Sequence, residues 1–202
     1  MKIFLAGEGV NDLGERAKHP SYVSDPPKHG VIEALLRKVR EDGWSVAGAV
    51  CWKDIQKGRP GQHASAEAQN VKGAALRAKE SGADILAFVR DRDGYPGRTD
   101  DIDDGMSRAA EIFAGQLTVV GGMAIEELES WILSLRGEPK AEGLRDPKAH
   151  LEAALKKDGL TLSTESMVAL VQSGDVQALP TDATSLRLWL ERAQAALQLL
   201  DG

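Results

Sequence analysis

The sequence predicts an α/β fold in which a mainly parallel sheet is flanked by helices and followed by a helical C-terminal region. Apolar runs about as long as a buried strand alternate with amphipathic segments, a pattern typical of a parallel sheet with helices on both faces. From Glu126 onward only helical spacing is found. We therefore expect an α/β domain over residues 1–135 and a helical region over residues 136–202 that packs on it.

The first half contains four predicted strands, and helices are expected between them. The strands are predicted over Ile3–Ala6, Ser45–Trp52, Asp84–Val89 and Leu117–Val120. The helices are predicted over Val31–Arg40, Ser65–Lys79 and a segment that ends near Ala114. In the first of these helices the apolar residues have helical spacing, and Gly43 ends it. The segment from Gly14 to Gly30 contains three prolines and is predicted to be a loop.

The second half is predicted to be helical, with the Gly137–Gly143 stretch as a hinge. Helices are expected over Glu126–Leu135, Pro147–Lys156, Thr164–Gln172 and Thr181–Leu200. The last helix has one apolar stripe, which Trp189 widens. The stripe consists of Leu186, Leu190, Ala193, Leu197 and Leu200. We favour burial of this stripe on the sheet domain; the alternative is a partner or homodimer interface with Trp189 as its anchor.

Composition excludes several classes of protein. No apolar run approaches the ~18 residues of a membrane span, and the lone Cys51 excludes an internal disulfide or a cysteine-based zinc cluster. We therefore expect a soluble, cytoplasmic protein without membrane contact. The net charge of −6 argues against a broad positive surface for nucleic acid. A phosphate backbone would have to be bound by local cations, for which Lys53, Arg90 and Arg92 are the candidates, although each could be a solvated surface charge.

Three groups of carboxylates follow predicted strands and are expected to meet at one edge of the sheet. Glu8 lies between two glycines after the first strand, and Asp91 and Asp93 follow the third. Glu127 and Glu129 follow the fourth strand, at the start of a predicted helix. The carboxyl ends of parallel strands lie along one edge, and carboxylates gathered there repel one another unless a cation binds. Because oxygen ligands suit Mg²⁺ or Mn²⁺, the sequence predicts a site for one of these ions.

The residues of this site have different expected roles. We expect Glu8, Asp91 and Asp93 to be catalytic and to bind the metal, with Glu8 either a further ligand or the general base. Glu127 and Glu129 flank the buried stripe of their helix on opposite sides, so only one of them should easily reach the metal. If the site is shared, the side chains of Glu8 and Asp91 should lie within ~12 Å of each other.

Simpler explanations exist for some of these carboxylates. Glu8 could face water on a plain turn, and Asp93 could merely turn the chain together with Gly94. Glu126 is interpreted as a solvated helix carboxylate. No catalytic role is assigned to Cys51 or to any histidine, because the four histidines share no ligand spacing.

Short motifs in this chain resemble those of known families. A Glu after the first strand and Asp91-Arg92-Asp93 after a later one resemble the Toprim fold of topoisomerases, primases and OLD-type nucleases. A longer stretch resembles the DUF4276 family of bacterial Toprim-like proteins. It comprises Glu127-Leu128-Glu129-Ser130-Trp131-Ile132-Leu133, the downstream Asp146-Pro147-Lys148-Ala149-His150-Leu151 and the tail Ser185-Leu186-Arg187-Leu188-Trp189-Leu190.

This resemblance implies a Mg²⁺-dependent nuclease acting on nucleic-acid phosphodiesters, in a phage-defence or mobile-element setting and beside an ATPase partner. Two features depart from the family pattern: Glu126 stands where an Arg is usual, and the loop from Lys53 to Gln62 is longer. The alternative is a non-catalytic, metal-binding subunit that regulates an ATPase. A small-molecule phosphotransferase or phosphohydrolase on the same fold is a third interpretation.

Overall fold

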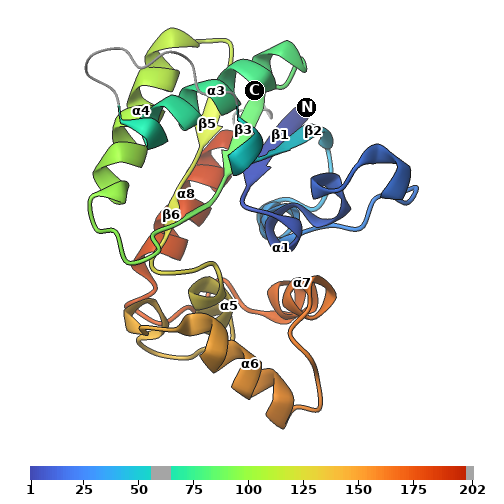
Figure 1. Ribbon diagram of the computed structural model, residues 1–202, viewed down its shortest axis with the longest axis vertical. Coiled ribbons are helices and arrows are strands. Elements are labelled where there is room, and N and C mark those ends of the chain that lie inside the picture. Colours follow the sequence, from blue (N-terminus) through green and yellow to red (C-terminus); the bar gives the residue numbers. More distant parts are fainter. Residues whose placement is uncertain (56–64, 199–202) are drawn as a thin grey trace.

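The computed structural model describes residues 1–55 and 65–198 and confirms the predicted α/β class, with a helical C-terminal region (Figure 1). Its centre is a four-stranded sheet in the order β2-β1-β3-β5, in which every neighbouring pair is parallel. The strands are β1 (Lys2–Gly7), β2 (Ser45–Cys51), β3 (Ile85–Phe88) and β5 (Thr118–Val120). Because all four run in one direction, their carboxyl ends lie along a single edge, as the sequence predicts.

Helices cover both faces of this sheet. The helices between the strands are α2 (Val31–Val39), α3 (Ala66–Glu80) and α4 (Arg98–Ile112). Alternate residues of β1 point to opposite faces: Ile3 and Leu5 belong to the hydrophobic cluster that includes α2, and Phe4 and Ala6 to the one that includes α3. Ser65 caps α3, since its side chain accepts a hydrogen bond from the Ala68 N–H at 3.1 Å.

Two short strands that the sequence does not predict form a separate two-stranded sheet, one after β3 and one after β5. β4 (Arg90–Asp91) pairs in parallel with β6 (Met123–Ala124), which places Asp91 beside Ala124. The pairing is made by the Arg90 N–H, which donates to the Gly122 carbonyl at 3.1 Å, and by the Arg92 N–H, which donates to the Ala124 carbonyl at 3.0 Å. Strands of two residues have too little periodicity to be recognised in a sequence. They matter because they position the carboxylate that follows β3.

The segments predicted as loops contain short helical turns. Between β1 and α2 lie α1 (Val10–Leu13), η1 (Gly14–Ala17) and η2 (Pro20–Tyr22), so the prediction of a plain loop from Gly14 to Gly30 was incomplete. Glu15 organises this segment because its carboxylate accepts hydrogen bonds from Ser24 and from the Lys28 N–H. After β2 the chain forms η3 (Trp52–Asp54); from residue 56 on, the predicted basic loop lies outside the described residues.

The C-terminal region consists of helices joined by short turns. They are α5 (Glu129–Leu135), η4 (Ala141–Gly143), α6 (Pro147–Lys157), α7 (Thr164–Ser173) and α8 (Thr184–Gln198). The predicted start of the first of these at Glu126 was wrong. Glu126 has a φ of 63°, in the left-handed region, so the chain turns there and the helix begins only at Glu129.

The last helix, α8, packs inside the molecule. Trp189 is fully buried, and its indole N–H donates to the Phe88 carbonyl of β3 at 2.9 Å. Its ring lies 5.9 Å from that of Trp131 in α5. The structure therefore shows that the apolar stripe packs inside the molecule from Leu186 to Leu197. Leu200 lies outside the described residues. Within the described residues, no helix has the length and apolar character needed to cross a membrane.

Candidate metal centre

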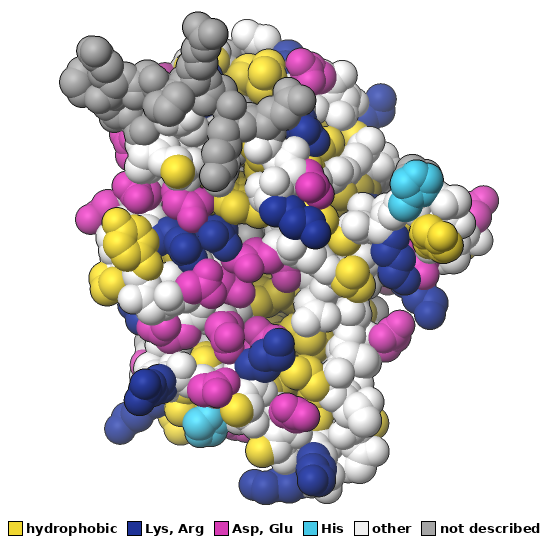
Figure 2. Space-filling view, viewed as in Figure 1, with side chains coloured by type: hydrophobic (Ala, Val, Ile, Leu, Met, Phe, Trp, Pro, Cys, Tyr) yellow, Lys and Arg dark blue, Asp and Glu magenta, His cyan; other side chains and the backbone are white. Residues whose placement is uncertain are grey.

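A cleft of about 440 Å³ lies at the carboxyl edge of the sheet, and we call it the acidic cleft. In the space-filling view, Asp and Glu side chains gather near the middle of this face, with Lys and Arg side chains among them (Figure 2). Six carboxylates line the cleft: Glu8, Asp12, Asp91, Asp93, Glu127 and Glu129. Five of the six are the predicted metal ligands, so the structure brings together residues that are up to 121 positions apart in the chain.

The end of β1 places two of these carboxylates. Glu8 follows Gly7 on a tight turn, and its Oε1 lies 3.3 Å from the backbone N of Asp91, so the predicted proximity of Glu8 and Asp91 is present. The Glu8 N–H donates to Asp12 Oδ2 at 2.5 Å. Gly7 is required here, because a Cβ at that position would lie 2.6 Å from the Asp12 Cβ.

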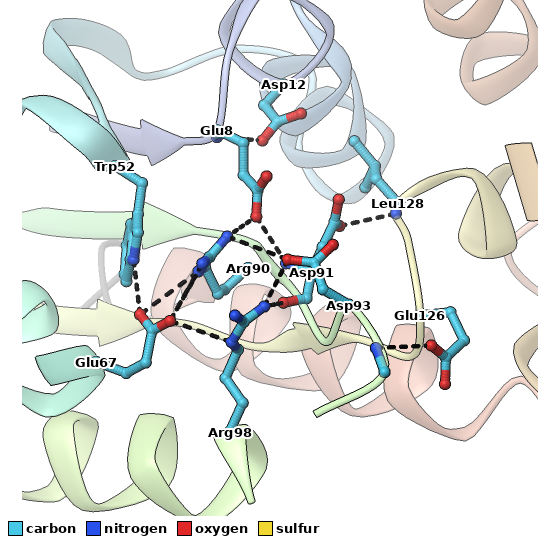
Figure 3. Close-up of polar contacts among 11 residues, drawn as sticks. Glu8, Asp12, Trp52, Glu67, Arg90, Asp91, Asp93, Arg98, Glu126 and Leu128 are labelled. Atoms are coloured by element: carbon cyan, nitrogen blue, oxygen red, sulfur yellow. Dashed lines mark hydrogen bonds and ion pairs between the residues drawn. The ribbon is translucent and has the colours of Figure 1, made fainter. Parts of the chain in front are cut away.

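Asp12 is a site residue that sequence reasoning missed. In the sequence, Asp12 occupies the position of the last glycine of a G-x-G-x-x-G pattern that begins at Gly7, which indicates only that the segment is not a dinucleotide-binding motif. A usable signal was its position four residues after Glu8, on the first turn of helix that follows β1. Asp12 is only 8% exposed, and its carboxylate points toward the same cleft as Glu8 (Figure 3).

The two aspartates that follow β3 have different environments. Asp91 lies in β4, and its Oδ1 accepts a hydrogen bond from the Leu128 N–H at 2.9 Å. Asp93 has a φ of 49°, its side chain is about half exposed, and its Oδ2 pairs with Arg98 at 2.6 Å. Asp91 is therefore fixed within the cleft, whereas Asp93 lies at its rim.

Both glutamates at the start of α5 line the cleft, although only one was expected to reach it easily. Glu127 precedes the helix instead of lying within it, and its Oε2 accepts a hydrogen bond from the Lys148 N–H at 3.1 Å. Glu129 is the first residue of α5 and is almost fully buried. The expectation assumed that the helix begins at Glu126. Because α5 begins only at Glu129, Glu127 does not follow helical geometry and can also reach the cleft.

Burial and mutual repulsion disfavour ionisation of three of these carboxylates. Burial, followed by repulsion from Glu129, raises the pKa of Asp12 to about 7. Burial, followed by repulsion from Asp12, raises the pKa of Asp91 to about 8. The pKa of Glu129 is also raised, chiefly by burial. In the part of the chain that the structure describes, no ion pair joins these three side chains to Lys or Arg. A bound cation would supply the missing positive charge.

Two arginines neutralise two of the other three carboxylates of the cleft. Arg90 pairs with Glu8, and Arg98 pairs with Asp93. Both arginines also pair with Glu67 of α3, whose Oε1 lies 3.1 Å from Arg90 Nη2 and 3.1 Å from Arg98 Nε (Figure 3). Glu67 was not recognised in the sequence, because a glutamate in the first turn of a helix is common.

The predicted phosphate contacts lie in three different places. Arg90 borders the acidic cleft with a side chain that is only 14% exposed, and Lys53 is exposed on η3. Arg92 forms an ion pair with Glu126. The interpretation of Glu126 as a solvated helix residue was wrong: it precedes the helix, pairs with Arg92 and accepts a hydrogen bond from the Gly94 N–H at 2.9 Å.

The residues of the acidic cleft fit a divalent cation in their chemistry. Among residues 1–55 and 65–198, no three Asp, Glu, His or Cys side chains are already arranged around one ion position. The donors are nonetheless all carboxylate oxygens, which suit Mg²⁺ or Mn²⁺. Asp12, Asp91 and Glu129 are the residues that would hold the ion, because no arginine of the described chain pairs with them and burial raises their pKa values.

Comparison with known proteins gave no match to a family model, to a curated protein or to a solved structure. The resemblance to Toprim-like proteins therefore stays a prediction based on the motifs quoted above.

Proposed function

We propose that this chain is a Mg²⁺- or Mn²⁺-dependent phosphodiesterase that acts on nucleic acid. The main support is the convergence of Asp12, Asp91 and Glu129, three carboxylates without a basic partner, on one cleft at the carboxyl edge of a parallel sheet. Such a group is stabilised when a divalent cation binds. Pairs of acidic groups with raised pKa values in a cleft are typical of functional sites.

The side chains around the cleft suit hydrolysis of a phosphodiester. Glu8, which is about one-third exposed, would accept a proton from the attacking water as the general base. Arg90 and Arg98, which pair with two carboxylates of the cleft, would bind the phosphate, because guanidinium groups match phosphate oxygens in geometry and charge. A bound Mg²⁺ would supply positive charge that stabilises the negative charge developing on the phosphate.

The substrate class rests on two further observations. The cleft is open to solvent, and Lys148 in its lining adds a cation that would pair with a further phosphate of an extended substrate. The Toprim-like motifs favour DNA or RNA as that chain and a phage-defence or mobile-element setting. Cytoplasmic location and an ATPase partner belong to the same proposal.

The test is cleavage of single- and double-stranded DNA and RNA with Mg²⁺, with Mn²⁺ and with EDTA. We expect metal-dependent cleavage by the parent chain, and a loss of at least about a hundredfold in Asp91→Asn and Glu8→Gln. The matched control is Asp104→Asn, because Asp104 lies on α4 away from the acidic cleft, is partly exposed and pairs with Arg108. Equal cleavage by the parent and both cleft variants would refute the assignment.

A non-catalytic, metal-binding regulatory subunit is the second candidate. It is favoured by the pairing of Arg90 with Glu8 and of Arg92 with Glu126, because two of the three cations expected to contact phosphate are already neutralised. Under this interpretation Mg²⁺ still raises the melting temperature, Asp91→Asn removes that effect, and no nucleic acid is cleaved. The two assays together therefore separate the two candidates.

A further inference from the structure

A second cleft, which we call the adjoining cleft, lies next to the acidic cleft and shares Glu8 with it. It has a volume of about 520 Å³, which is within the range of pockets that hold small organic ligands. Its lining differs from that of the acidic cleft, because it includes aromatic, amide and basic side chains. They include Trp52, Lys53, Asn70 and Arg90, together with Glu67.

Arg90 lies at the border between the two clefts. Its guanidinium pairs with Glu8, which lines both clefts, and with Glu67, which lines only the adjoining cleft. Figure 3 shows Arg90 between these two carboxylates. A phosphate bound by Arg90 near the acidic cleft would therefore have its neighbouring nucleoside at the adjoining cleft.

Asn70 gives the adjoining cleft a hydrogen-bonding group without a partner. It lies on α3, is only 6% exposed, and its Oδ1 is buried without a hydrogen-bond donor. Buried polar atoms are nearly always paired, and an unpaired one is unfavourable. Because Asn70 also lines the cleft, a ligand that offers an N–H group would satisfy it. Nucleobases offer such groups on their edges.

Another part of the lining of the adjoining cleft is apolar and fixed. Trp52 is nearly buried, its ring lies 5.4 Å from that of Phe88, and its indole N–H donates to Glu67 Oε2 at 2.8 Å. Lys53, the next residue, is exposed at the rim. The apolar wall suits the face of a nucleobase, the amide oxygen of Asn70 suits the edge of the base, and Lys53 suits a phosphate.

We propose that the adjoining cleft binds the nucleoside next to the phosphate that lies at the acidic cleft. Asn70 Oδ1 accepts a hydrogen bond from the base, and Lys53 contacts the phosphate on the outer side. This inference rests on the proposed function, since it names the part of the nucleic-acid substrate that lies beside the reacting phosphate.

The test compares AMP with ribose 5-phosphate, which lacks the base, in EDTA and without added metal. Affinities are measured by NMR titration of the whole chain, following the side-chain NH₂ signals of Asn70. We expect AMP to bind about tenfold more tightly than ribose 5-phosphate and to shift these signals. Asn70→Leu should remove the difference and leave the affinity for ribose 5-phosphate unchanged.

Two further variants check the position of the ligand. Lys53→Ala should weaken AMP and ribose 5-phosphate by the same factor, about threefold, because it removes only a phosphate contact. Lys72→Ala, which removes an exposed lysine of α3, is the control and should change neither affinity.

The possible outcomes distinguish this inference from the proposed function. If AMP binds no more tightly than ribose 5-phosphate, or if Asn70→Leu keeps the difference, the nucleoside site is refuted even when the chain cleaves nucleic acid. If AMP shows the expected preference and the chain neither binds Mg²⁺ nor cleaves, the proposed function fails and the nucleoside site stands. The comparison of the two ligands uses the parent chain, so it does not depend on the folding of any variant.

Discussion

At the scale of single residues, the carboxylates of the acidic cleft form two groups. Among the described residues, Glu8 and Asp93 have arginine partners, whereas Asp12, Asp91, Glu127 and Glu129 do not. The first group can stay ionised without a metal, because guanidinium groups offset their charge. The second group is stabilised as anions only by a cation from solution. The carboxylates whose ionised form is least stabilised by the protein therefore lie where the proposed metal would bind.

This division predicts how stability depends on pH. Asp12 and Asp91 have folded-state pKa values of about 7 and about 8, above the ordinary value of an aspartate. The folded chain thus binds more protons than the unfolded chain between about pH 4 and pH 8, so its stability falls as pH rises through that window. In EDTA, Asp12→Asn should raise the free energy of unfolding at pH 8 by about 1–3 kcal/mol and change it little at pH 4, as measured by urea denaturation.

Two comparisons support or overturn that prediction. Mg²⁺ at about 100 times its Kd should add ~2.7 kcal/mol to the parent at pH 8 and much less to Asp12→Asn. Asp42→Asn changes an exposed aspartate and serves as the control, with no gain expected at either pH. A parent chain whose stability rises from pH 5 to pH 8 in EDTA would contradict the raised pKa values.

Glu67 is a positioning residue, because it binds two arginines without lining the acidic cleft. Glu67→Gln keeps the shape of the side chain and removes its charge, so Arg90 and Arg98 lose a shared anchor. We expect the free energy of unfolding to fall by about 1–3 kcal/mol, because hydrogen bonds to charged groups are lost. Cleavage should fall about tenfold through a higher KM for nucleic acid, since the arginines bind the phosphate.

The matched control is Glu111→Gln, which changes an exposed glutamate near the end of α4. If Glu67→Gln lowered kcat and left KM unchanged, Glu67 would act on the chemical step and not through the arginines.

At the scale of secondary-structure elements, the sequence predicts the long, periodic segments well. The strands around Ile3–Ala6 and Ser45–Trp52 and the central helices are present with small shifts at their ends. Their apolar runs and amphipathic stripes are long enough to be read from local pattern. The predicted meeting of Glu8 and Asp91 followed from the parallel sheet alone.

The elements that the sequence misses are short or depend on tertiary contacts. β4 and β6 have two residues each, and the residues that pair between them are 33 positions apart in the chain. The start of α5 depends on the left-handed backbone of Glu126, which is stabilised by contacts with Arg92 and Gly94. Asp12 and Glu67 could not be assigned, because their roles appear only when distant segments come together.

The link between β5 and β6 provides a test at this scale. A Cβ on Gly121 would lie 2.2 Å from the Phe88 ring and 2.6 Å from Met106 Sδ, and Phe88 is fully buried. Gly121→Ala should therefore lower the free energy of unfolding by about 1–3 kcal/mol, because the core must shift to admit the methyl group. Gly143→Ala is the control, since a Cβ there meets nothing within 4 Å. Equal thermal stability of the two variants would contradict this packing.

At the scale of the whole molecule, one hydrophobic cluster joins the sheet to the C-terminal helices. It contains Ile3 and Leu35 from the first half as well as Leu151 and Trp189 from the second. Trp189 is central because it contacts Trp131 of α5 and donates a hydrogen bond to the Phe88 carbonyl of β3. Since α5 begins with Glu129, this packing also helps to fix one wall of the acidic cleft.

Removal of Trp189 should therefore weaken the fold and the cleft together. Trp189→Ala should lower the free energy of unfolding by about 3–5 kcal/mol, because it leaves a cavity where a buried ring was. The neighbouring Leu188→Ala is the control, since Leu188 is 46% exposed, and it should change stability by less than about 0.5 kcal/mol. The measurement is urea denaturation of the monomer, followed by tryptophan fluorescence and by circular dichroism. Coincident transitions are expected from both probes, because the shared cluster couples the two halves. A Trp189→Ala variant as stable as the parent, but altered in its self-association, would show instead that α8 forms an interface.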